Sequence, residues 1–431
     1  MVLSTLLFRK RMLARYLSLR FDDAVTSLKQ QLKVEPNTLL RKNHLFELFR
    51  NTAYLSSRAV CGADSSDPEE LAHKTEMRLR QILTEGEAVN IPADPLFKLA
   101  GFATFCDFPT YRPCRCLVES SDGGLLGTAG VGGALHVIPT VEANTDTMSR
   151  KPNWQVTTRL HGHTDDVTAI DFHPRRNIIA SGGVGMNIIL HDINSSNGFV
   201  NSTSEIQRLT DSFPIRCLKF HPCGDFLYVG TDNSIIRLYD IATRTCFTAK
   251  HTRRQHQGGA INSCDVLRSG GLLFTAGEDG SVLMWDGRNL DVLHALADAH
   301  GGAPVLSVNC ERYGRYLTSS GKDGSTKITD LRMMRELACV GHMNRGVIRT
   351  VSNFMCNTRY VATYSVIQSG RRTSNEVLVY CVDTGSQEID ISKIMGRSSI
   401  LGICASQHDM ALYLLADDSN CKVVSIFDPS A

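Results

Sequence analysis

The segment HGHTDD, which spans residues 161–166, places two histidines and two aspartates within six positions. Neutral imidazoles and a carboxylate suit zinc, and a bound zinc could activate a water molecule as a nucleophile. His161, His163 and Asp165 fit the H-x-H-x-D ligand pattern of metallohydrolases, although Asp166 stands where such enzymes usually place a second-metal histidine. The alternative is structural, with the same residues forming a hinge that precedes a β-strand.

The residues that follow this segment favour the structural interpretation. Apolar residues alternate closely enough to predict three short strands with turns between them. The predicted strands span Val167–Phe172, Ile178–Ser181 and Ile188–His191. Three strands within about thirty residues are typical of a β-propeller blade, and Gly162-His163 then corresponds to the GH pair that opens a WD40 repeat.

The same unit recurs along the chain. The tripeptide Phe-His-Pro begins at Phe172 and again at Phe220, and the signature pair Trp285-Asp286 ends a later copy. The aspartates that end four successive copies are Asp192, Asp240, Asp286 and Asp330. Their spacings of 48, 46 and 44 residues are close to the WD40 period of roughly 40–45 residues.

Three weaker copies complete the series, beginning at Cys114, Ile348 and Ile400, which gives seven in all. One four-stranded blade cannot bury both of its faces, whereas a closed ring buries them between neighbouring blades. The sequence therefore predicts an all-β, seven-bladed WD40 β-propeller, preceded by a small α-helical N-terminal module.

WD40 blades often contain a buried hydrogen-bonded set made of a histidine, a strand hydroxyl, a turn aspartate and a tryptophan. This chain keeps the set only partly, because one blade ends in Trp-Asp and Val184 stands where the turn aspartate of the second blade is expected. We therefore expect apolar packing to hold the ring more than polar networks do. The residues predicted to form the structural motif are His163, Asp192, Asp232, Asp240, Asp279, Trp285, Asp286, Asp323 and Asp330.

The composition argues against several classes of function. The formal net charge of +2 gives no global attraction to nucleic acid or acidic lipid. No apolar run reaches the roughly eighteen residues of a membrane-spanning helix, so no membrane partner is expected. The chain has no phosphate-binding loop of the G-x-x-x-x-G-K type, no G-x-S-x-G elbow and no second zinc cluster. These observations predict a non-enzyme without cofactor or metal.

The chain has 14 cysteines, which are dispersed through the predicted strands and turns. No C-x-x-C pair occurs among them. We expect them to be small buried hydrophobic residues in a reducing compartment rather than metal ligands or disulfides.

Residues 1–56 have a different pattern from the rest of the chain. Apolar side chains recur at intervals of three and four, which predicts short helices. Such helices form little core on their own, so their exposed apolar faces predict self-association, most simply as a two-fold dimer. The residues predicted to form the dimer interface are Leu13, Tyr16, Leu17, Val25, Leu28 and Leu32.

The first 21 residues allow a second interpretation. They carry five basic residues and no acidic residue before Asp22, which is the composition of a mitochondrial transit peptide. The helical periodicity continues past Asp22-Asp23 into acid-containing sequence, and this continuity favours a folded module. We expect residues 57–110 to be a linker with one short helix, and residues 111–431 to be the propeller.

Partner-facing residues are expected on the rim of the propeller, where loops between strands gather. Alignment of the blades places Asp166 at such a position, and two further charged residues directly precede the turn aspartates. The basic segment 251–256 is either a solvated loop or a contact for phosphate or an acidic peptide. The predicted rim residues are Asp166, Arg253, Arg254, Glu278 and Lys322.

Several stretches, taken together and in order, resemble the WD40 subunit of cleavage stimulation factor, which acts in messenger-RNA 3′-end processing. They are HTDDVTAIDFHP with IIASGG, then FHPCGDFLYVGT with RLYDIATRTCF, then AGEDGSVLMWDG and RYLTSSGKDGSTKI. The resemblance covers about residues 160–331 and is looser over the outer blades. Near the N-terminus, YLSLRFDDAVTSLKQQL and LLRKNHLFELF resemble the helical homodimerisation domain of that family.

This resemblance implies a nuclear, non-catalytic scaffold of the pre-mRNA cleavage and polyadenylation machinery. The N-terminal module would pair two copies, and the propeller would dock the helical-repeat subunit of cleavage stimulation factor and other 3′-end processing factors. Direct RNA contact stays open, because no aromatic platform interleaved with basic residues is visible. The alternatives are a WD40 adaptor of a ubiquitin ligase or chromatin complex, and a metallohydrolase using His161, His163 and Asp165.

Overall fold

The computed structural model divides the chain into two compact units, Met1–Leu96 and Phe97–Ala431. The structure describes residues 101–107, 114–139, 158–196, 199–249, 255–257, 259–296, 299–341, 346–355, 359–369, 372–391, 400–406, 411–416 and 420–425. The predicted helical module of residues 1–56, with its six dimerisation residues, lies outside the described residues. Arg253 and Arg254 also lie outside them.

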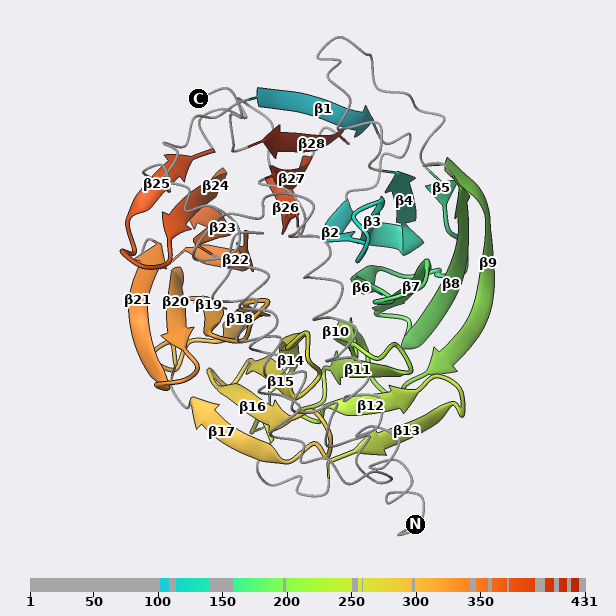
Figure 1. The fold of residues 1–431 in the computed structure, drawn as a ribbon, viewed down its shortest axis with the longest axis horizontal. Coiled ribbons are helices and arrows are strands. Elements are labelled where there is room, and N and C mark those ends of the chain that lie inside the picture. The colour runs from blue at the N-terminus through green and yellow to red at the C-terminus, as the bar shows by residue number, and fades with distance from the viewer. Residues whose placement is uncertain are drawn as a thin grey trace, which may run out of the picture. The chain divides into compact units, whose positions relative to one another are not determined.

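The described residues form seven four-stranded antiparallel sheets, which surround a common axis as blades (Figure 1). We number the blades I to VII along the chain and name the strands of each blade a to d, from the axis outward. Consecutive blades contact one another around the whole circle, including blade VII with blade I through β26 and β2. The predicted WD40 β-propeller class is therefore confirmed.

The strands of the first three blades are as follows. Blade I contains β2 (Cys114–Glu119), β3 (Leu125–Gly130), β4 (Leu135–Pro139) and β5 (Thr158–Arg159), with the 3-10 helix η1 (Val131–Gly133) between β3 and β4. Blade II contains β6 (Val167–Phe172), β7 (Ile178–Gly183), β8 (Asn187–Ser196) and β9 (Phe199–Thr210). Blade III contains β10 (Ile215–Phe220), β11 (Phe226–Thr231), β12 (Arg237–Asp240) and β13 (Thr245–Thr248).

The remaining blades follow the same order. Blade IV contains β14 (Ile261–Val266), β15 (Leu272–Gly277), β16 (Val282–Asp286) and β17 (Val292–Leu296), and blade V contains β18 (Val305–Cys310), β19 (Tyr316–Gly321), β20 (Ser325–Asp330) and β21 (Arg335–Gly341). Blade VI contains β22 (Val347–Phe354), β23 (Tyr360–Ser369), β24 (Arg372–Cys381) and β25 (Gln387–Asp390). Blade VII contains β26 (Ile400–Ala405), β27 (Ala411–Ala416) and β28 (Asn420–Ser425) from the C-terminal part of the chain.

The fourth strand of blade VII is β1 (Gly101–Asp107), which pairs antiparallel with β28 at the outer edge of the ring (Figure 1). The propeller therefore begins before residue 111, and the predicted boundary of the linker at residue 110 was too late. A strand whose partner lies more than 300 residues away in the sequence has no neighbouring hairpin signal, so the local pattern could not reveal it. The pairing of β1 with β28 completes the fourth strand of blade VII and so joins the two ends of the propeller sequence in one blade.

Apolar side chains hold neighbouring blades together. Between blades II and III, one cluster joins Ala180, Ile188 and Leu190 to Leu218 and Leu227, all of them buried. Each strand presents alternate side chains to its two faces, so each blade contributes one apolar layer to each neighbour. This packing is the main stabilisation expected for a ring whose blades share no sheet.

Side-chain hydrogen bonds also link the inner a strands of neighbouring blades. Asp171 Oδ2 accepts a bond from the Phe220 backbone N at 2.8 Å, and Asp265 Oδ2 accepts one from the Cys310 N at 2.7 Å. The donor and acceptor sit at matching positions in each pair, so the a strands of neighbouring blades run in the same direction. The a–b and c–d turns therefore gather on one face of the ring, the AB–CD face, while the b–c turns and d–a connections gather on the other, the BC–DA face.

Blade II departs from its neighbours in the hairpin β8–β9. Asp192 was predicted to end the third strand, but β8 continues to Ser196 and Asp192 is paired with Ser204 of β9. Ile193 is buried at 2% exposure and extends the apolar face past the expected turn. The strand therefore continues where a shorter blade would turn.

No α-helix occurs among the described residues, and none of their helices is long and apolar enough to cross a membrane.

Candidate functional site

The side chains of the HGHTDD segment have separate partners. His163 Nε2 lies 2.8 Å from Ser181 Oγ, and burial lowers the pKa of His163 to about 4. Asp166 Oδ1 accepts a bond from the Gly132 N at 2.7 Å, while the His161 carbonyl lies 2.7 Å from His191 Nε2. Among the described residues, no group of three or more histidine, cysteine, aspartate or glutamate side chains is placed to hold a metal ion.

Blade IV contains a complete buried polar set. His256 Nδ1 lies 3.0 Å from Asp279 Oδ1, and His256 Nε2 lies 2.8 Å from Thr275 Oγ1. The indole Nε1 of Trp285 donates to the same Thr275 hydroxyl at 2.9 Å. Burial alone would raise the pKa of Asp279, but hydrogen bonds from His256 and Ser281 outweigh it and hold that pKa well below its usual range.

His256 was not identified from the sequence as a member of this set, because it was assigned to a basic loop. It is 1% exposed and lies five residues before Ile261, the first residue of β14. His300 has the same spacing from Val305, the first residue of β18, and is 3% exposed. This shared spacing is the signal that could have identified both histidines.

Blade V has the same set without its tryptophan. His300 Nδ1 lies 3.1 Å from Asp323 Oδ1, and His300 Nε2 lies 2.9 Å from Ser319 Oγ. Thr329 stands at the register position of Trp285, because it pairs with Leu317 as the indole residue pairs with Leu273. Burial lowers the pKa of His300 despite the neighbouring Asp323 carboxylate.

Blade III places its predicted turn aspartate elsewhere. The strand register aligns Asn233, rather than Asp232, with Asp279. Asp232 is exposed and forms an ion pair with Arg216. A different polar set replaces the usual one here: the Tyr239 hydroxyl donates to Asp211 Oδ2 at 2.7 Å, and Arg237 Nε lies 3.4 Å from the same oxygen.

Blade II also differs from the sequence alignment by one position. The register of β6 with β7 aligns Gly185 with the turn aspartate, whereas Val184 corresponds to Glu278. The Asp165 carboxylate approaches to 2.8 Å of the place where a Gly185 Cβ would lie. His163 therefore keeps its strand hydroxyl but has no turn carboxylate of the kind that blades IV and V supply.

Three of the four repeat-ending aspartates close c–d turns. Asp240 Oδ1 accepts a bond from the Ala242 N at 3.0 Å, and Asp286 Oδ1 accepts one from the Arg288 N at 2.9 Å. Asp330 Oδ1 accepts a bond from the Arg332 N at 2.8 Å. Each carboxylate thus satisfies backbone donors of a tight turn, a role that aspartate favours.

The predicted rim residues that the structure describes lie on the BC–DA face. The backbone N of Glu278 donates to the Ala260 carbonyl at 2.9 Å, and that of Lys322 donates to the Pro304 carbonyl at 2.8 Å. The Val184 N donates equivalently to the Asp166 carbonyl at 3.0 Å. The Asp232 N bonds the Pro214 carbonyl in the same way, so Asp232 belongs to this ring of rim positions.

Lys219 lies between two carboxylates at the inner strands. Its Nζ is 3.0 Å from Asp171 Oδ1 and 4.0 Å from Asp265 Oδ1. Burial alone would lower the pKa of Lys219, but the two carboxylates outweigh it and raise the pKa above its usual value. The charges compensate one another, which indicates an interblade clamp rather than a vacant ligand site.

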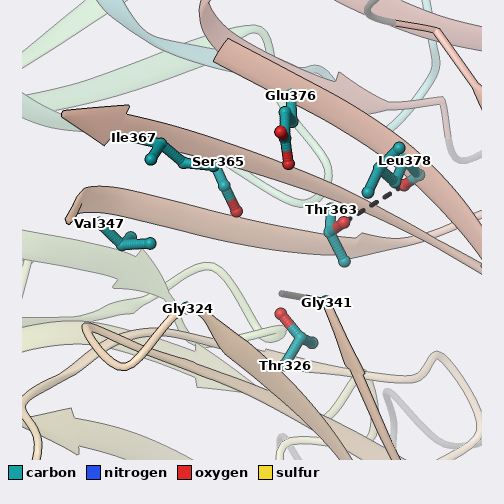
Figure 2. A pocket seen from close by; sticks show the side chains of 9 residues that line it. All are labelled: Gly324, Thr326, Gly341, Val347, Thr363, Ser365, Ile367, Glu376 and Leu378. Carbon is teal, nitrogen blue, oxygen red and sulfur yellow. Dashed lines mark hydrogen bonds between the residues drawn. The ribbon is translucent and has the colours of Figure 1, made fainter. Parts of the chain in front are cut away.

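A small cleft lies between blades V and VI (Figure 2). Its lining residues are Gly324, Thr326, Gly341, Val347, Thr363, Ser365, Ile367, Glu376 and Leu378. Thr363 Oγ1 donates to the Leu378 carbonyl at 3.3 Å, so this hydroxyl is already hydrogen-bonded within blade VI.

Comparisons with known proteins agree with this architecture. The family model described as WD domain, G-beta repeat matches residues 154–192, 204–240 and 247–286. The crystal structure of the Myceliophteria thermophila Cps50 (Swd1) beta-propeller domain is similar with a TM-score of 0.58 and 14% identity, covering 77% of this chain and 100% of that one.

Curated relatives match part of the chain. Cleavage stimulation factor subunit 50 of Arabidopsis thaliana is 29% identical over 197 residues, which cover 45% of this chain and 44% of that protein. WD repeat-containing protein RUP1 of Arabidopsis thaliana is 29% identical over 154 residues, covering 34% of this chain and 38% of that protein. The chain spans less than half the length of these curated relatives. The three matched WD40 repeats, the closed ring of blades and the fold neighbour together show that the chain is a β-propeller that contains WD40 repeats.

Proposed function

We propose that this protein is a non-catalytic scaffold subunit of the pre-mRNA 3′-end cleavage and polyadenylation machinery. The observation that carries the proposal is the similarity to cleavage stimulation factor subunit 50 over 197 residues. The ordered stretches HTDDVTAIDFHP, FHPCGDFLYVGT and AGEDGSVLMWDG support it, because they resemble that family in the same order along the chain. The nucleus is the compartment in which such a subunit works.

A rigid propeller suits this role because its loops present binding groups on a fixed frame. The rim residues Asp166, Glu278 and Lys322 have backbones held by hydrogen bonds, so their side chains start from defined positions on the BC–DA face. Preorganised side chains lose less conformational entropy when a partner binds. The helical-repeat subunit of cleavage stimulation factor and other 3′-end processing factors are the proposed partners.

The test is a gentle purification of the tagged full-length chain from its own cells, with identification of the co-purifying proteins. Recovery of cleavage and polyadenylation subunits is the expected result. The tag alone and a tagged unrelated propeller serve as controls. Recovery of ubiquitin-ligase, chromatin or mitochondrial proteins in their place would contradict the proposed role while leaving the fold unchanged.

Self-association through the N-terminal helices is a separate part of the proposal. Leu17→Asp and Leu28→Asp each place a charge in the proposed apolar interface, where an unpaired charge costs several kcal/mol. Light scattering of the full chain should show a dimer that becomes a monomer in these variants. Ser18→Asp, at a polar position beside Leu17 in the sequence, serves as the matched control. A dimer that survives both leucine substitutions would exclude this interface.

A further inference from the structure

Arginine is frequent in the described turns of the AB–CD face. The described a–b and c–d turns of blades II to VI carry Arg175, Arg176, Arg244, Arg268, Arg288, Arg312, Arg315, Arg332 and Arg359. No lysine occurs in these described turns. The turns are scattered through the sequence and meet on one face only because all a strands run in the same direction.

Several acidic side chains near these arginines are buried. Two others are exposed: Asp383, which lies 4.0 Å from Arg359, and Glu336, which pairs with Lys327. Asp240, Asp286 and Asp330 are buried at 4%, 8% and 6% exposure because they close the c–d turns, and Glu311 is fully buried. Arg332, by contrast, is 62% exposed, and Arg288 is 48% exposed. The guanidinium groups of Arg288 and Arg332 therefore face solvent, while the carboxylates of Asp286 and Asp330 lie beneath them.

The described turns on the opposite face have mainly the other sign. The b–c turns and d–a connections carry Asp165, Asp166, Asp211, Asp232, Glu278, Asp279 and Asp323, with Lys322 as a basic residue. The net charge of the whole chain is only +2, so composition does not show this difference between the described turns of the two faces. Arg253 and Arg254, in the connection between blades III and IV, lie outside the described residues.

An exposed apolar side chain lies among the arginines. Met333 is 63% exposed, and Arg332 and Arg335 flank it in blade V. The turn beneath it is fixed, because Asp330 Oδ1 accepts bonds from the Arg332 N at 2.8 Å and the Met333 N at 3.2 Å. Leu337, on the neighbouring edge strand β21, adds a second exposed apolar side chain at 39%.

We propose that the AB–CD face around blade V binds an acidic polypeptide segment of a partner protein. Arginine forks match carboxylates in a bidentate geometry, and methionine adapts to apolar side chains of varied shape. A nucleic acid would use the arginines but gains little from an exposed methionine and leucine between them. The combination of charge and apolar surface therefore favours a protein segment in which acidic residues alternate with leucine-like residues.

This inference specifies a class of partner for the proposed scaffold. It rests on the proposed function only in that the propeller is a binding module. The direct test measures fluorescence anisotropy of the purified full chain with a labelled peptide of glutamate with leucine at every fourth position. Binding should weaken about tenfold when glutamine replaces glutamate, and should weaken steeply as salt is raised. Replacing leucine by serine should weaken binding about threefold.

Substitutions in the protein locate the site. Neutralising the flanking charges in the double variant Arg332→Gln, Arg335→Gln should weaken peptide binding about fivefold, and Met333→Ser should mimic the loss of leucine from the peptide. Arg216→Gln on the opposite face is the matched control and should leave binding unchanged. Thermal unfolding of each variant checks that the propeller is intact.

Three outcomes would overturn the proposal: no peptide binding, equal weakening by Arg216→Gln, or tighter binding of an oligouridylate than of the peptide with the same dependence on Arg332 and Arg335. The last outcome would assign the face to RNA. Because the test uses purified protein and synthetic ligands, its failure is independent of which complex the protein enters, and the purification from cells tests that complex separately.

Discussion

Blades IV and II show two ways of stabilising the same four-stranded unit. Blade IV joins its loop, turn and strands through a chain of hydrogen bonds that runs from Asp279 to His256, Thr275 and Trp285. Blade II keeps only the contact between His163 and Ser181. Both blades have the same strand order and the same register irregularity between a and b strands.

This difference shows that a four-stranded blade forms without the complete histidine, hydroxyl, aspartate and tryptophan set. Ile179, Ile188 and Ile189 of blade II are fully buried, as Trp285 of blade IV is. In blade II a second histidine, His191, stands at the indole position and reaches the His161 carbonyl at 2.7 Å. Apolar packing is therefore common to both blades, while the polar contacts vary.

The largest expected effect comes from removing the indole. Trp285→Ala should lower the free energy of unfolding by about 3–5 kcal/mol, because it leaves a cavity and removes one of the two hydrogen bonds of the Thr275 hydroxyl. His191→Ala in blade II should cost clearly less, about 1–3 kcal/mol, because the side chain is smaller. Chemical denaturation of both variants checks the comparison, and equal losses would mean that blade IV does not depend on its polar set.

The second-largest effect is expected from acid, which should lower the stability of blade II. Burial lowers the pKa of His163 and of His173 to about 4, below the usual value near 6.5. The folded state therefore binds fewer protons than the unfolded state between these values, so stability is full above about pH 6.5 and is lost as pH falls toward 4. His163→Gln should flatten this dependence in thermal unfolding between pH 4 and 7, and an unchanged slope would remove His163 from the account.

The turn aspartate of blade IV should contribute less than the indole. Asp279→Ala should cost about 1–3 kcal/mol, because the buried His256 Nδ1 and the Ser281 hydroxyl lose their acceptor. Asp232→Ala is the matched control, since that residue is exposed and should change stability by no more than about 0.5 kcal/mol. Comparable losses in the two variants would contradict the assignment of Asn233 as the structural equivalent of Asp279.

The smallest effect comes from restoring the missing carboxylate in blade II. The double variant Gly185→Asp, Asp165→Ser gives His163 a turn partner and removes the side chain that would approach it too closely. A gain of about 0.5–1.5 kcal/mol is expected in denaturant unfolding, as for one added hydrogen bond. Asp165→Ser alone should give no gain, and destabilisation by the double variant would show that the blade II turn does not accept the polar set.

The sequence by itself determined the class of fold and much of the motif. Alternation of apolar residues and aspartates at a regular spacing are local signals. The first two strands of blade II therefore fall close to their predicted ranges, and the third strands of blades III to V end at the predicted aspartates. Asp240, Asp286 and Asp330 act within their own turns, which is why their sequence context sufficed. Asp232 and Val184 were misplaced by one position because the composition of a turn does not fix the register of the strands that flank it.

Tertiary structure decided what depends on distant residues. Pairing of β1 with β28 closes the ring, and the sequence near β1 gives no sign of it because the partner strand is more than 300 residues away. His256 belongs to a segment that is basic in composition, and its burial follows from its packing against blade IV. The arginines of the AB–CD face lie in turns far apart along the chain, and the parallel inner strands bring them together. Strand formation depends on the residues themselves, whereas strand partners, burial and surface charge depend on which segments the ring places side by side.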